Sequence, residues 1–480
     1  MGSKVVSAAK SVLIGSFISK GISFISTIIL ARLLFPEDYG SLLLATIITG
    51  LIGQIGSMGF ELYYLQFKGE KSEREKLLKQ VYFLRVIMNF ILFLIQFIAG
   101  IVLIVLFSEK ISGGIIVLLS FSLMIEGFNS PQETILRDQI NFKKITIGNI
   151  YREIFGTLAK IASAFWGLGG LSFGIGPVVG SVIRLFYFRY VVKYQPGKIF
   201  IDRKIAVNIF NYGKYMLFAS AGNFLVQQVD KFVLASFFSK EIVGRYTFSW
   251  NFASMPFNYL IVPQAQLNMS YITRFKAGDY VLFDKLSIIQ KMIFFIFFPV
   301  TLFLLFFVEE AVVFLFSDKW IETVPIVSIL LVYYAFQSIT FPFSGVLNGL
   351  GRPDINSRIL VSRAIVLVIS LLLVSFLYSD IITYTYVFVG VSLVFDIIKI
   401  IKTFNLIGVL NNSVFFKFQL DILFFLLICL MYFLNIENEI YRLFLFVFLI
   451  MVFFISSYLF DKEKSILAYN LFKDSLLSKI

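Results

Sequence analysis

The stretch LLFPEDYG, Leu33–Gly40, decides how the rest of the chain is organised. It is a short polar turn between two long apolar runs, Ser11–Leu33 and Gly40–Phe60. A second turn of this kind, FFSKEIVG at Phe237–Gly244, also lies between two apolar runs. Glu37 matches Glu241 and Gly40 matches Gly244, each at an offset of 204 residues. The two turns predict a duplicated membrane bundle in which each copy begins with one of these hairpins.

Composition points to a membrane protein. Of the 480 residues, 59% are hydrophobic and 15% are charged, whereas soluble proteins are usually about one quarter charged. The chain has no His and a single Cys, Cys429. These counts exclude an internal disulfide, His or Cys metal sites and every His-dependent catalytic arrangement. We therefore expect no metal, no cofactor and no enzymatic activity.

The apolar runs set the number of helices. A membrane-spanning helix needs about twenty mostly apolar residues. Runs of this kind predict about fourteen helices, near 11–33, 40–60, 80–107, 112–130, 146–167, 171–192, 213–237, 241–265, 288–308, 321–347, 357–378, 381–402, 418–435 and 440–460. The first run lacks a small-residue cleavage site, so we interpret it as a spanning helix and not as a signal peptide.

The basic residues predict the orientation of these helices. The net charge is +13, and Lys and Arg gather on the cytoplasmic side of membrane proteins. If the N-terminus is cytoplasmic, the cytoplasmic segments hold 29 Lys and Arg, and the opposite connections hold three. An even number of helices with both termini in the cytoplasm fits this alternation. Nucleic-acid binding would need a basic soluble domain, and the sequence has none.

The repeat predicts the domain boundaries. We expect an N-terminal lobe of six helices at 1–192, a cytoplasmic linker at 193–212, and a C-terminal lobe of six helices at 213–402. Two additional helices and a cytoplasmic tail occupy 403–480. Helix orientation is the same in both copies, which indicates parallel repeats with a substrate site between them near the bilayer midplane. No nucleotide-binding phosphate loop occurs, so the energy source would be an ion gradient or the substrate gradient.

Ten basic residues fall inside predicted helices, where an unpaired charge is costly. Four of them lie near a helix end, where a long side chain can reach the headgroups: Arg32, Arg85, Arg245 and Arg442. For Arg184 the sequence leaves two interpretations open: its side chain reaches the headgroups, or it is buried within the bundle. The other five, Lys20, Arg152, Lys160, Lys231 and Arg363, are candidates for a cationic lumen.

Two helices of the first copy carry these cations on one face. Lys20 shares a face with Ser16 and two further hydroxyl residues, which predicts either a water-filled cavity or a hydrogen-bonded seam between helices. Arg152 and Lys160 alternate with Gly148 and Gly156 at steps of four. Close helix packing would explain the glycines, but it does not explain the cations, so we favour a cavity.

The second copy carries a similar set. Asn223, Gln227, Asp230 and Lys231 form another polar stripe, in which the acid and the base could also neutralise each other. Arg363 stands about as far into its helix as Arg152 does, and Asp396 is its nearest acidic candidate partner. We take Asp230 and Asp396 as candidates for ion coupling. With five cations against two acids, the lumen would attract an anion and repel organic cations, and Arg and Lys are the usual partners of phosphate oxygens.

Several segments resemble a known family. They are ARLLFPEDYGSLLLATIITGLIGQIGSMGFE (31–61), LRDQINFKKITIGNI (136–150), GKYMLFASAGNFLVQQVDKFVLASFFSKEIVGRYTFSWNFASMPF (213–257) and GVLNGLGRPDIN (345–356). Together they are similar to the polysaccharide transporter family, the Wzx-type O-antigen and capsule flippases of the multidrug/oligosaccharidyl-lipid/polysaccharide exporter superfamily. The similarity extends over roughly residues 8 to 400.

The resemblance implies an all-α, MATE-like fold of two pseudo-symmetric six-helix lobes with two extra helices. It also implies transfer of an undecaprenyl-pyrophosphate-linked oligosaccharide across the bacterial cell membrane for surface polysaccharide or O-antigen (lipopolysaccharide) biosynthesis. The partners would be the lipid-linked oligosaccharide and membrane lipids, with a polysaccharide polymerase and glycosyltransferases as candidates, and the protein would be a monomer. Two alternatives remain: an ion-coupled multidrug exporter, and a membrane enzyme such as a glycan polymerase or acyltransferase.

Overall fold

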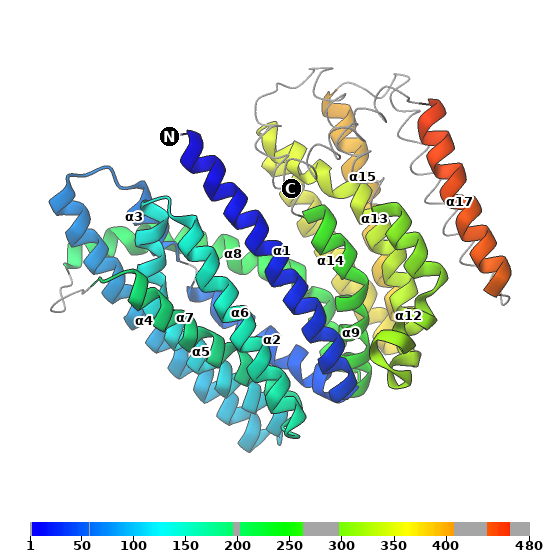
Figure 1. Ribbon diagram of the computed structural model, residues 1–480, viewed down its shortest axis with the longest axis horizontal. Helices are drawn as coiled ribbons and strands as arrows, with labels where there is room; N and C mark the ends of the chain where they lie inside the picture. The colour runs from blue at the N-terminus through cyan, green and yellow to red at the C-terminus, as the bar shows by residue number, and fades with distance from the viewer. Residues whose placement is uncertain (1, 57, 195–201, 263–296, 408–438, 461–480) are drawn as a thin grey trace. The chain divides into compact units, whose positions relative to one another are not determined.

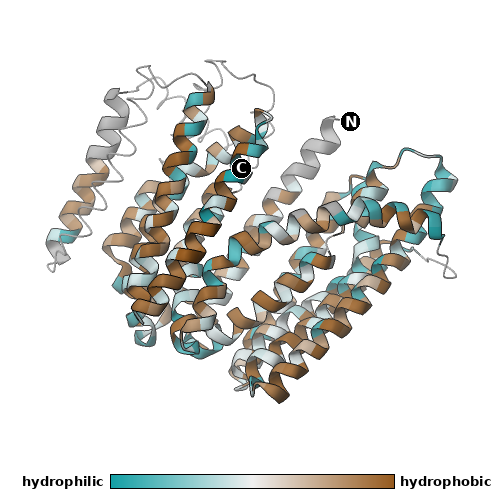
Figure 2. Ribbon diagram, turned by 180° about the vertical axis from the view of Figure 1, so that it is seen from behind, coloured by the Kyte–Doolittle hydropathy of each residue, from teal (hydrophilic) through white to brown (hydrophobic). Residues whose placement is uncertain are grey.

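The computed structural model describes residues 2–56, 58–194, 202–262, 297–407 and 439–460. Every regular element in these ranges is a helix, and most of the helices are long and apolar. The chain divides into two compact units, Met1–Thr247 and Phe248–Ile480. Figure 2 shows hydrophobic residues along the long helices and polar residues gathered mainly at helix ends. The predicted fold class, an all-α membrane protein, is confirmed.

The first unit is a bundle of long helices (Figure 1). Its α5 packs on both α4 and α7, while α6 packs on α7 and α1, and α2 packs on α8. The helices are α1 (Gly2–Leu33), α2 (Pro36–Gly56), α3 (Phe60–Gln66), α4 (Lys71–Leu106), α5 (Lys110–Asp138), α6 (Phe142–Phe165), a 3₁₀ turn η1 (Gly169–Leu171), α7 (Ser172–Val191) and α8 (Arg203–Phe237). The helix α9 (Lys240–Pro256) begins in this unit and ends in the next.

The turn that opens the first copy is stabilised by Asp38. The carboxylate of Asp38 accepts a hydrogen bond from the backbone N–H of Phe35 at 3.0 Å, which closes the turn between α1 and α2. It also accepts one from the backbone N–H of Gly170 at 2.7 Å, in the η1 turn that precedes α7. Asp38 is buried, and a buried carboxylate needs such partners. The polar turn therefore ties the first hairpin to a segment more than a hundred residues later.

The two duplicated turns touch each other through their glycines. A Cβ on Gly40 would overlap the backbone carbonyl oxygen of Lys240, and a Cβ on Gly244 would overlap that of Pro36. The two contacts are equivalent, because Lys240 follows Pro36 by the same 204 residues that separate the glycines. Only a residue without a side chain allows two backbones to approach so closely. This reciprocal contact, between the starts of α2 and α9, explains why both turns end in Gly.

The second unit contains two pairs of packed helices, α13 with α15 and α14 with α15. Its elements are a π-helical turn η2 (Phe257–Ile261), the helix Phe297–Phe306, α12 (Val308–Phe316), a 3₁₀ turn η3 (Asp318–Thr323), α13 (Val324–Gly349), α14 (Pro353–Leu377), α15 (Ile381–Ile407) and α17 (Glu439–Phe460). Its core is aromatic: Phe248 stacks on Trp320 with ring centroids 3.9 Å apart, and the ring of Phe316 stands edge-on to Phe248.

The predicted helices agree with the observed ones in most places. Within the described residues, eight helices are long and apolar enough to span a membrane, and a bent pair would make a ninth. The helices α6 and α8 are less apolar because they carry the charges discussed below. The predicted helix 418–435 lies outside the described residues, as do residues 263–265 of the predicted helix 241–265 and residues 288–296 of 288–308. The lobe boundaries predicted from the repeat stay a prediction.

Several helix ends differ from the prediction. The helix α4 begins at Lys71 and not near residue 80, and α8 begins at Arg203, inside the predicted linker 193–212. The helix predicted at 112–130 continues to Asp138, through Pro131. The segment after Phe306, predicted as a connection, forms the short helix α12, bent by 84° from the preceding helix. Glu309 and Glu310 occupy its first turn, where acidic residues favour a helix N-terminus, and Val312 and Phe316 are buried on its other side.

Candidate functional site

The carboxylate of Glu126 joins three helices of the first unit. Its Oε1 accepts a hydrogen bond from Ser181 of α7 at 3.0 Å and pairs with the Arg152 guanidinium of α6 at 3.2 Å. Its Oε2 accepts a hydrogen bond from Arg184 of α7 at 2.8 Å. Ser122, one turn earlier on α5, lies 2.9 Å from the Ser181 hydroxyl. Polar side chains of α5, α6 and α7 therefore meet at one carboxylate.

Arg184 is the buried cation of this cluster. Its side chain is 7% exposed, and its two terminal nitrogens pair with Glu126 and Glu133, both from α5. Its guanidinium also lies 4.7 Å from the centre of the Phe188 ring. A charge this deep is tolerated only among opposite charges and hydrogen-bond acceptors. Of the two interpretations that the sequence left open for Arg184, the structure supports the buried one.

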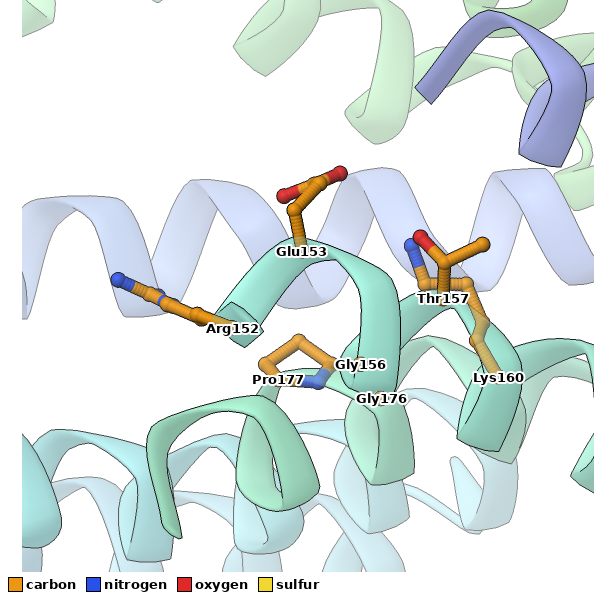
Figure 3. A pocket seen from close by; sticks show the side chains of 7 residues that line it. All are labelled: Arg152, Glu153, Gly156, Thr157, Lys160, Gly176 and Pro177. Atoms are coloured by element: carbon orange, nitrogen blue, oxygen red, sulfur yellow. The ribbon is translucent and has the colours of Figure 1, made fainter. Parts of the chain in front are cut away.

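A cavity of about 100 Å³ lies beside this cluster, between α6 and α7. Its lining residues are Arg152, Glu153, Gly156, Thr157, Lys160, Gly176 and Pro177. Figure 3 shows Glu153 and Lys160 projecting to the same side of α6, with the Lys160 nitrogen close to Thr157, while Arg152 extends in another direction. Two candidate cations of the sequence analysis thus line one cavity, together with one carboxylate.

The glycines of α6 have a separate role in packing. A Cβ on Gly156 would lie 2.9 Å from the backbone oxygen of Gly176, and one on Gly148 would press against the ring of Phe188. Close approach of α6 and α7 therefore depends on small residues, as in other membrane helix pairs. Both explanations weighed for this face apply: the glycines permit the packing, and the cations face the cavity.

Lys20 of α1 lies at the same depth as Arg152. Gly15 of α1 touches the side chain of Thr146 of α6, and the two helices run in the same direction from there (Figure 1). Lys20 is five residues beyond this contact and Arg152 is six, which is about 8 to 9 Å for each at 1.5 Å per residue. Lys20 is partly buried, whereas Ser16 is exposed. The cavity lining does not include either residue.

The polar stripe of α8 forms a separate group. Gln227 donates a hydrogen bond from its amide to the Asn223 side-chain oxygen at 3.1 Å, and both residues are exposed. Asp230 is buried, and Lys231 next to it is partly buried. None of the residues that line the cavity comes from α8.

The second unit has its own arginine cluster, built on α13, α14 and α15. Arg363 of α14 donates hydrogen bonds from one terminal nitrogen to the hydroxyl of Tyr333 at 3.0 Å and to that of Ser392 at 2.9 Å. Asp396 of α15 is buried, pairs with Lys399 at 2.8 Å, and accepts a hydrogen bond from the Gln337 amide. The partner that the structure gives to Asp396 is therefore Lys399 from its own helix.

The two clusters are copies of each other. Arg152 and Arg363 are both ten residues beyond the first residue of their helices and are 211 residues apart. The same offset relates the other members of the clusters: Ser122 and Tyr333, Glu126 and Gln337, Ser181 and Ser392. It also relates Pro131 to Pro342, the internal prolines of α5 and α13. The duplication thus covers three helices and four interacting positions in each unit.

Sequence reasoning missed the acidic partners. Glu126 stands close to the end of the predicted helix 112–130, where the sequence predicts a solvated side chain, but its side chain is 23% exposed and has three partners. Three of the arginines expected to reach the headgroups also have carboxylate partners: Arg85 with Glu61, Arg245 with Glu241, and Arg442 with Glu310. The 211-residue offset could have drawn attention to Glu126, because it places Gln337 at the same position.

These groups suit the binding of an anion more than a reaction. Arg152 and Lys160 present charged donors to a partly buried space, where Coulomb attraction is stronger than in bulk water. In the described part of the chain, no group of three or more Cys, Asp or Glu is placed to hold a metal ion. The arrangement can hold a phosphate-like group and supplies it with hydrogen-bond donors.

Comparisons with known proteins give a matching family and relatives of this chain. A family model described as "Polysaccharide biosynthesis protein" matches residues 29–325. The lipopolysaccharide biosynthesis protein WzxC of Escherichia coli K12 is 24% identical over 410 residues, which are 83% of this chain and 79% of that protein.

Solved structures share the fold. A lipid II flippase MurJ in an inward closed conformation superposes with a TM-score of 0.66 at 17% identity, over 94% of this chain and 98% of that one. An inward-facing multidrug resistance MATE family transporter gives a TM-score of 0.64 at 15% identity, over 84% and 99%. These similarities establish a MATE-like fold, as the sequence predicted.

Proposed function

This chain belongs to the polysaccharide biosynthesis protein family, and on that premise we propose that it is a flippase for a lipid-linked oligosaccharide. The substrate would be an undecaprenyl-pyrophosphate-linked repeat unit of a surface polysaccharide such as O-antigen. The observation that carries the proposal is the cavity lined by Arg152 and Lys160, about halfway along a helix in the first unit. A cation at mid-depth is costly unless it has a function or a partner.

The chemistry of the cations favours a pyrophosphate group. A guanidinium binds phosphate oxygens through two parallel hydrogen bonds, and an ammonium binds them as a point charge. Arg152 and Lys160 would hold the pyrophosphate in the first unit, with Lys20 at the same depth, and Arg363 would supply a second cationic contact. Lys231, Ser16, Asn223 and Gln227 would contact the sugar. The polyprenyl tail would stay in the lipid.

The transport cycle we propose is alternating access. The cationic site would open first to the inner face of the membrane and then to the outer face, driven by the substrate gradient or by an ion gradient. The termini would both be cytoplasmic, because basic residues gather in the segments assigned to that side. Fusions of a reporter that is active on only one side of the membrane, placed after residues 40, 110 and 240, would test this orientation.

The test of the function is a double substitution, Lys20→Ala with Lys160→Ala. It removes two cations from inside membrane helices while leaving the packing glycines in place, so the protein should still insert in the membrane. We expect loss of surface polysaccharide and accumulation of the lipid-linked precursor. The matched control is Lys143→Ala with Lys144→Ala, because both residues are exposed at the start of α6. Normal export by the first variant would refute the assignment.

The buried carboxylates favour a second candidate, an ion-coupled multidrug exporter. Asp230 and Asp396 are both buried, and carboxylates within the membrane often bind coupling ions. Asp396, however, pairs with Lys399, which offsets its charge. The exporter predicts drug resistance on overexpression and unchanged glycans, whereas the flippase predicts the opposite pair of results.

A further inference from the structure

Arg152 is the most accessible member of the Glu126 cluster. Its side chain is 40% exposed, against 7% for Arg184, and its 3.2 Å pairing is the longest of the three contacts that Glu126 makes. Two residues of α7, Ser181 and Arg184, fix the carboxylate in place. Glu126 is therefore the stationary partner, and Arg152 is the partner that a ligand in the cavity can reach.

A phosphate and a carboxylate use the same donors of a guanidinium. An anionic group that enters the cavity would therefore share Arg152 with Glu126 or take it over. A partly exposed ion pair contributes little to stability, so such an exchange has a small cost. It also works in reverse, because Glu126 can take Arg152 back when the anion leaves.

The copy in the second unit lacks this carboxylate. The position of Glu126 is occupied there by Gln337, whose amide donates a hydrogen bond to Asp396, while Arg363 bonds to two hydroxyls. Equivalent positions thus surround an arginine in both units, with an acid among them in the first unit and an amide in its place in the second. This contrast separates the charge of Glu126 from the backbone arrangement that holds the arginine.

We propose that Glu126 is a positioning residue that competes with the anionic group of the substrate for Arg152. Its charge sets how tightly the first unit holds that group and how readily the group is released. The inference rests on the proposed function, since it assumes that an anion binds at Arg152. Without the carboxylate, the anion would bind more tightly and leave more slowly.

The experiment measures binding of inorganic pyrophosphate to the purified full-length protein by calorimetry. Glu126→Gln keeps the size of the side chain and one acceptor oxygen but removes the competing charge. We expect its Kd to fall by about fivefold, which corresponds to about 1 kcal/mol at 1.4 kcal/mol per tenfold change. A variant that only damages the structure would bind more weakly, so the direction of the change is diagnostic.

Glu133→Gln is the matched control. It removes the same charge from the same helix and from the same partner, Arg184, but Glu133 has no ion pair with Arg152. Its Kd should stay within about twofold of that of the wild type. In an Arg152→Ala background, Glu126→Gln should no longer tighten binding, because the residue for which the two anions compete is gone.

The outcomes separate this inference from the proposed function. If the wild type binds pyrophosphate and Glu126→Gln does not tighten binding, or tightens it no more than Glu133→Gln, competition is refuted and the function stands. If no form of the protein binds pyrophosphate, the proposed function fails as well. Should Glu126→Gln fail to fold, Glu126→Asp keeps the charge but draws it back by one methylene, and a lower Kd is again the expected result.

Discussion

The two arginine clusters have the same skeleton and different chemistry. In the first unit, Arg152 pairs with the carboxylate of Glu126, which also binds the buried Arg184. In the second, Arg363 bonds to the hydroxyls of Tyr333 and Ser392 and lies 6.0 Å from the centre of the Phe388 ring. Duplication has preserved the arginine, the serine and a helix-internal proline, while the acid has become an amide and a serine has become a tyrosine.

The difference separates what the fold requires from what the site requires. A proline stands at the equivalent place in α5 and α13, at residues 131 and 342, where it removes one backbone hydrogen bond from each helix. The charges around the arginines can change without altering that frame. Arg152 is paired with a carboxylate, whereas Arg363 bonds to two hydroxyls and lies near an aromatic ring, so substitutions around the two arginines should have unequal effects.

The largest difference should appear at Arg184. Substitution by Ala would leave Glu126 and Glu133 without the buried cation that they share, and breaking a buried pair costs about 3 to 5 kcal/mol. The free energy of unfolding in a denaturant titration is the measurement. Arg137→Ala is the control, because Arg137 pairs with the same Glu133 but is 50% exposed, and it should cost less than about 1 kcal/mol. If both variants lost the same free energy of unfolding, burial of Arg184 would add nothing to its contribution.

The next largest loss of stability is expected at the contact between Gly40 and Gly244, where the two copies are still alike. Gly40→Ala and Gly244→Ala should each destabilise the protein by about 1 to 3 kcal/mol, because a rigid backbone carbonyl occupies the space of the new methyl group. The two losses should be similar, since the contacts are reciprocal. Thermal unfolding of the purified variants is the measurement.

Gly53→Ala supplies the control for both glycines. Gly53 lies in α2, as Gly40 does, and no atom lies within 4 Å of a Cβ built there. Ala favours a helix over Gly by up to about 1 kcal/mol, so this variant should be neutral or slightly more stable. A loss at Gly40 without a loss at Gly244 would contradict the reciprocal contact.

A smaller difference in stability is expected between substitutions of Tyr333 and Ser122, which occupy the same position in the two copies. Tyr333→Phe removes an acceptor from the Arg363 guanidinium and should cost about 1.5 kcal/mol, as is usual for a hydrogen bond to a charged group. Ser122→Ala removes a bond between two neutral hydroxyls and should cost about 0.5 kcal/mol. If the order were reversed in unfolding titrations, Arg363 would not depend on the tyrosine hydroxyl.

Much of the fold could be predicted because the signals are local. About twenty apolar residues in a row can only cross the bilayer as a helix, and the glycines of the duplicated turns predicted two equivalent hairpins. The extension of α5 through Pro131 was missed, since a proline usually suggests a helix end. The bend before α12 was missed because Val308–Phe316 is too short to register as a spanning helix.

The site was only half visible from the sequence. Cations inside an apolar helix stand out, so the sequence named Arg152, Lys160 and Arg363 as candidates, and their role in binding stays a prediction. Their partners come from other helices, and which helices touch depends on packing that no single periodicity contains. Glu126 could therefore be identified as a partner of the arginines only from the structure. The change in offset from 204 residues at the hairpins to 211 at the clusters also hid the match of Glu126 with Gln337, although the match of Arg152 with Arg363 was predicted.

The most direct test of the central claim is transport in proteoliposomes. A pyrophosphate-linked oligosaccharide lipid is placed in one leaflet, and an enzyme that modifies only exposed sugar reports its arrival in the other. The account predicts that the wild type speeds transfer over protein-free vesicles, that Arg152→Ala with Arg363→Ala returns the rate to the protein-free level, and that Arg137→Ala leaves it unchanged. Equal rates for the wild type and the double variant would contradict a cationic site for an anionic lipid-linked sugar.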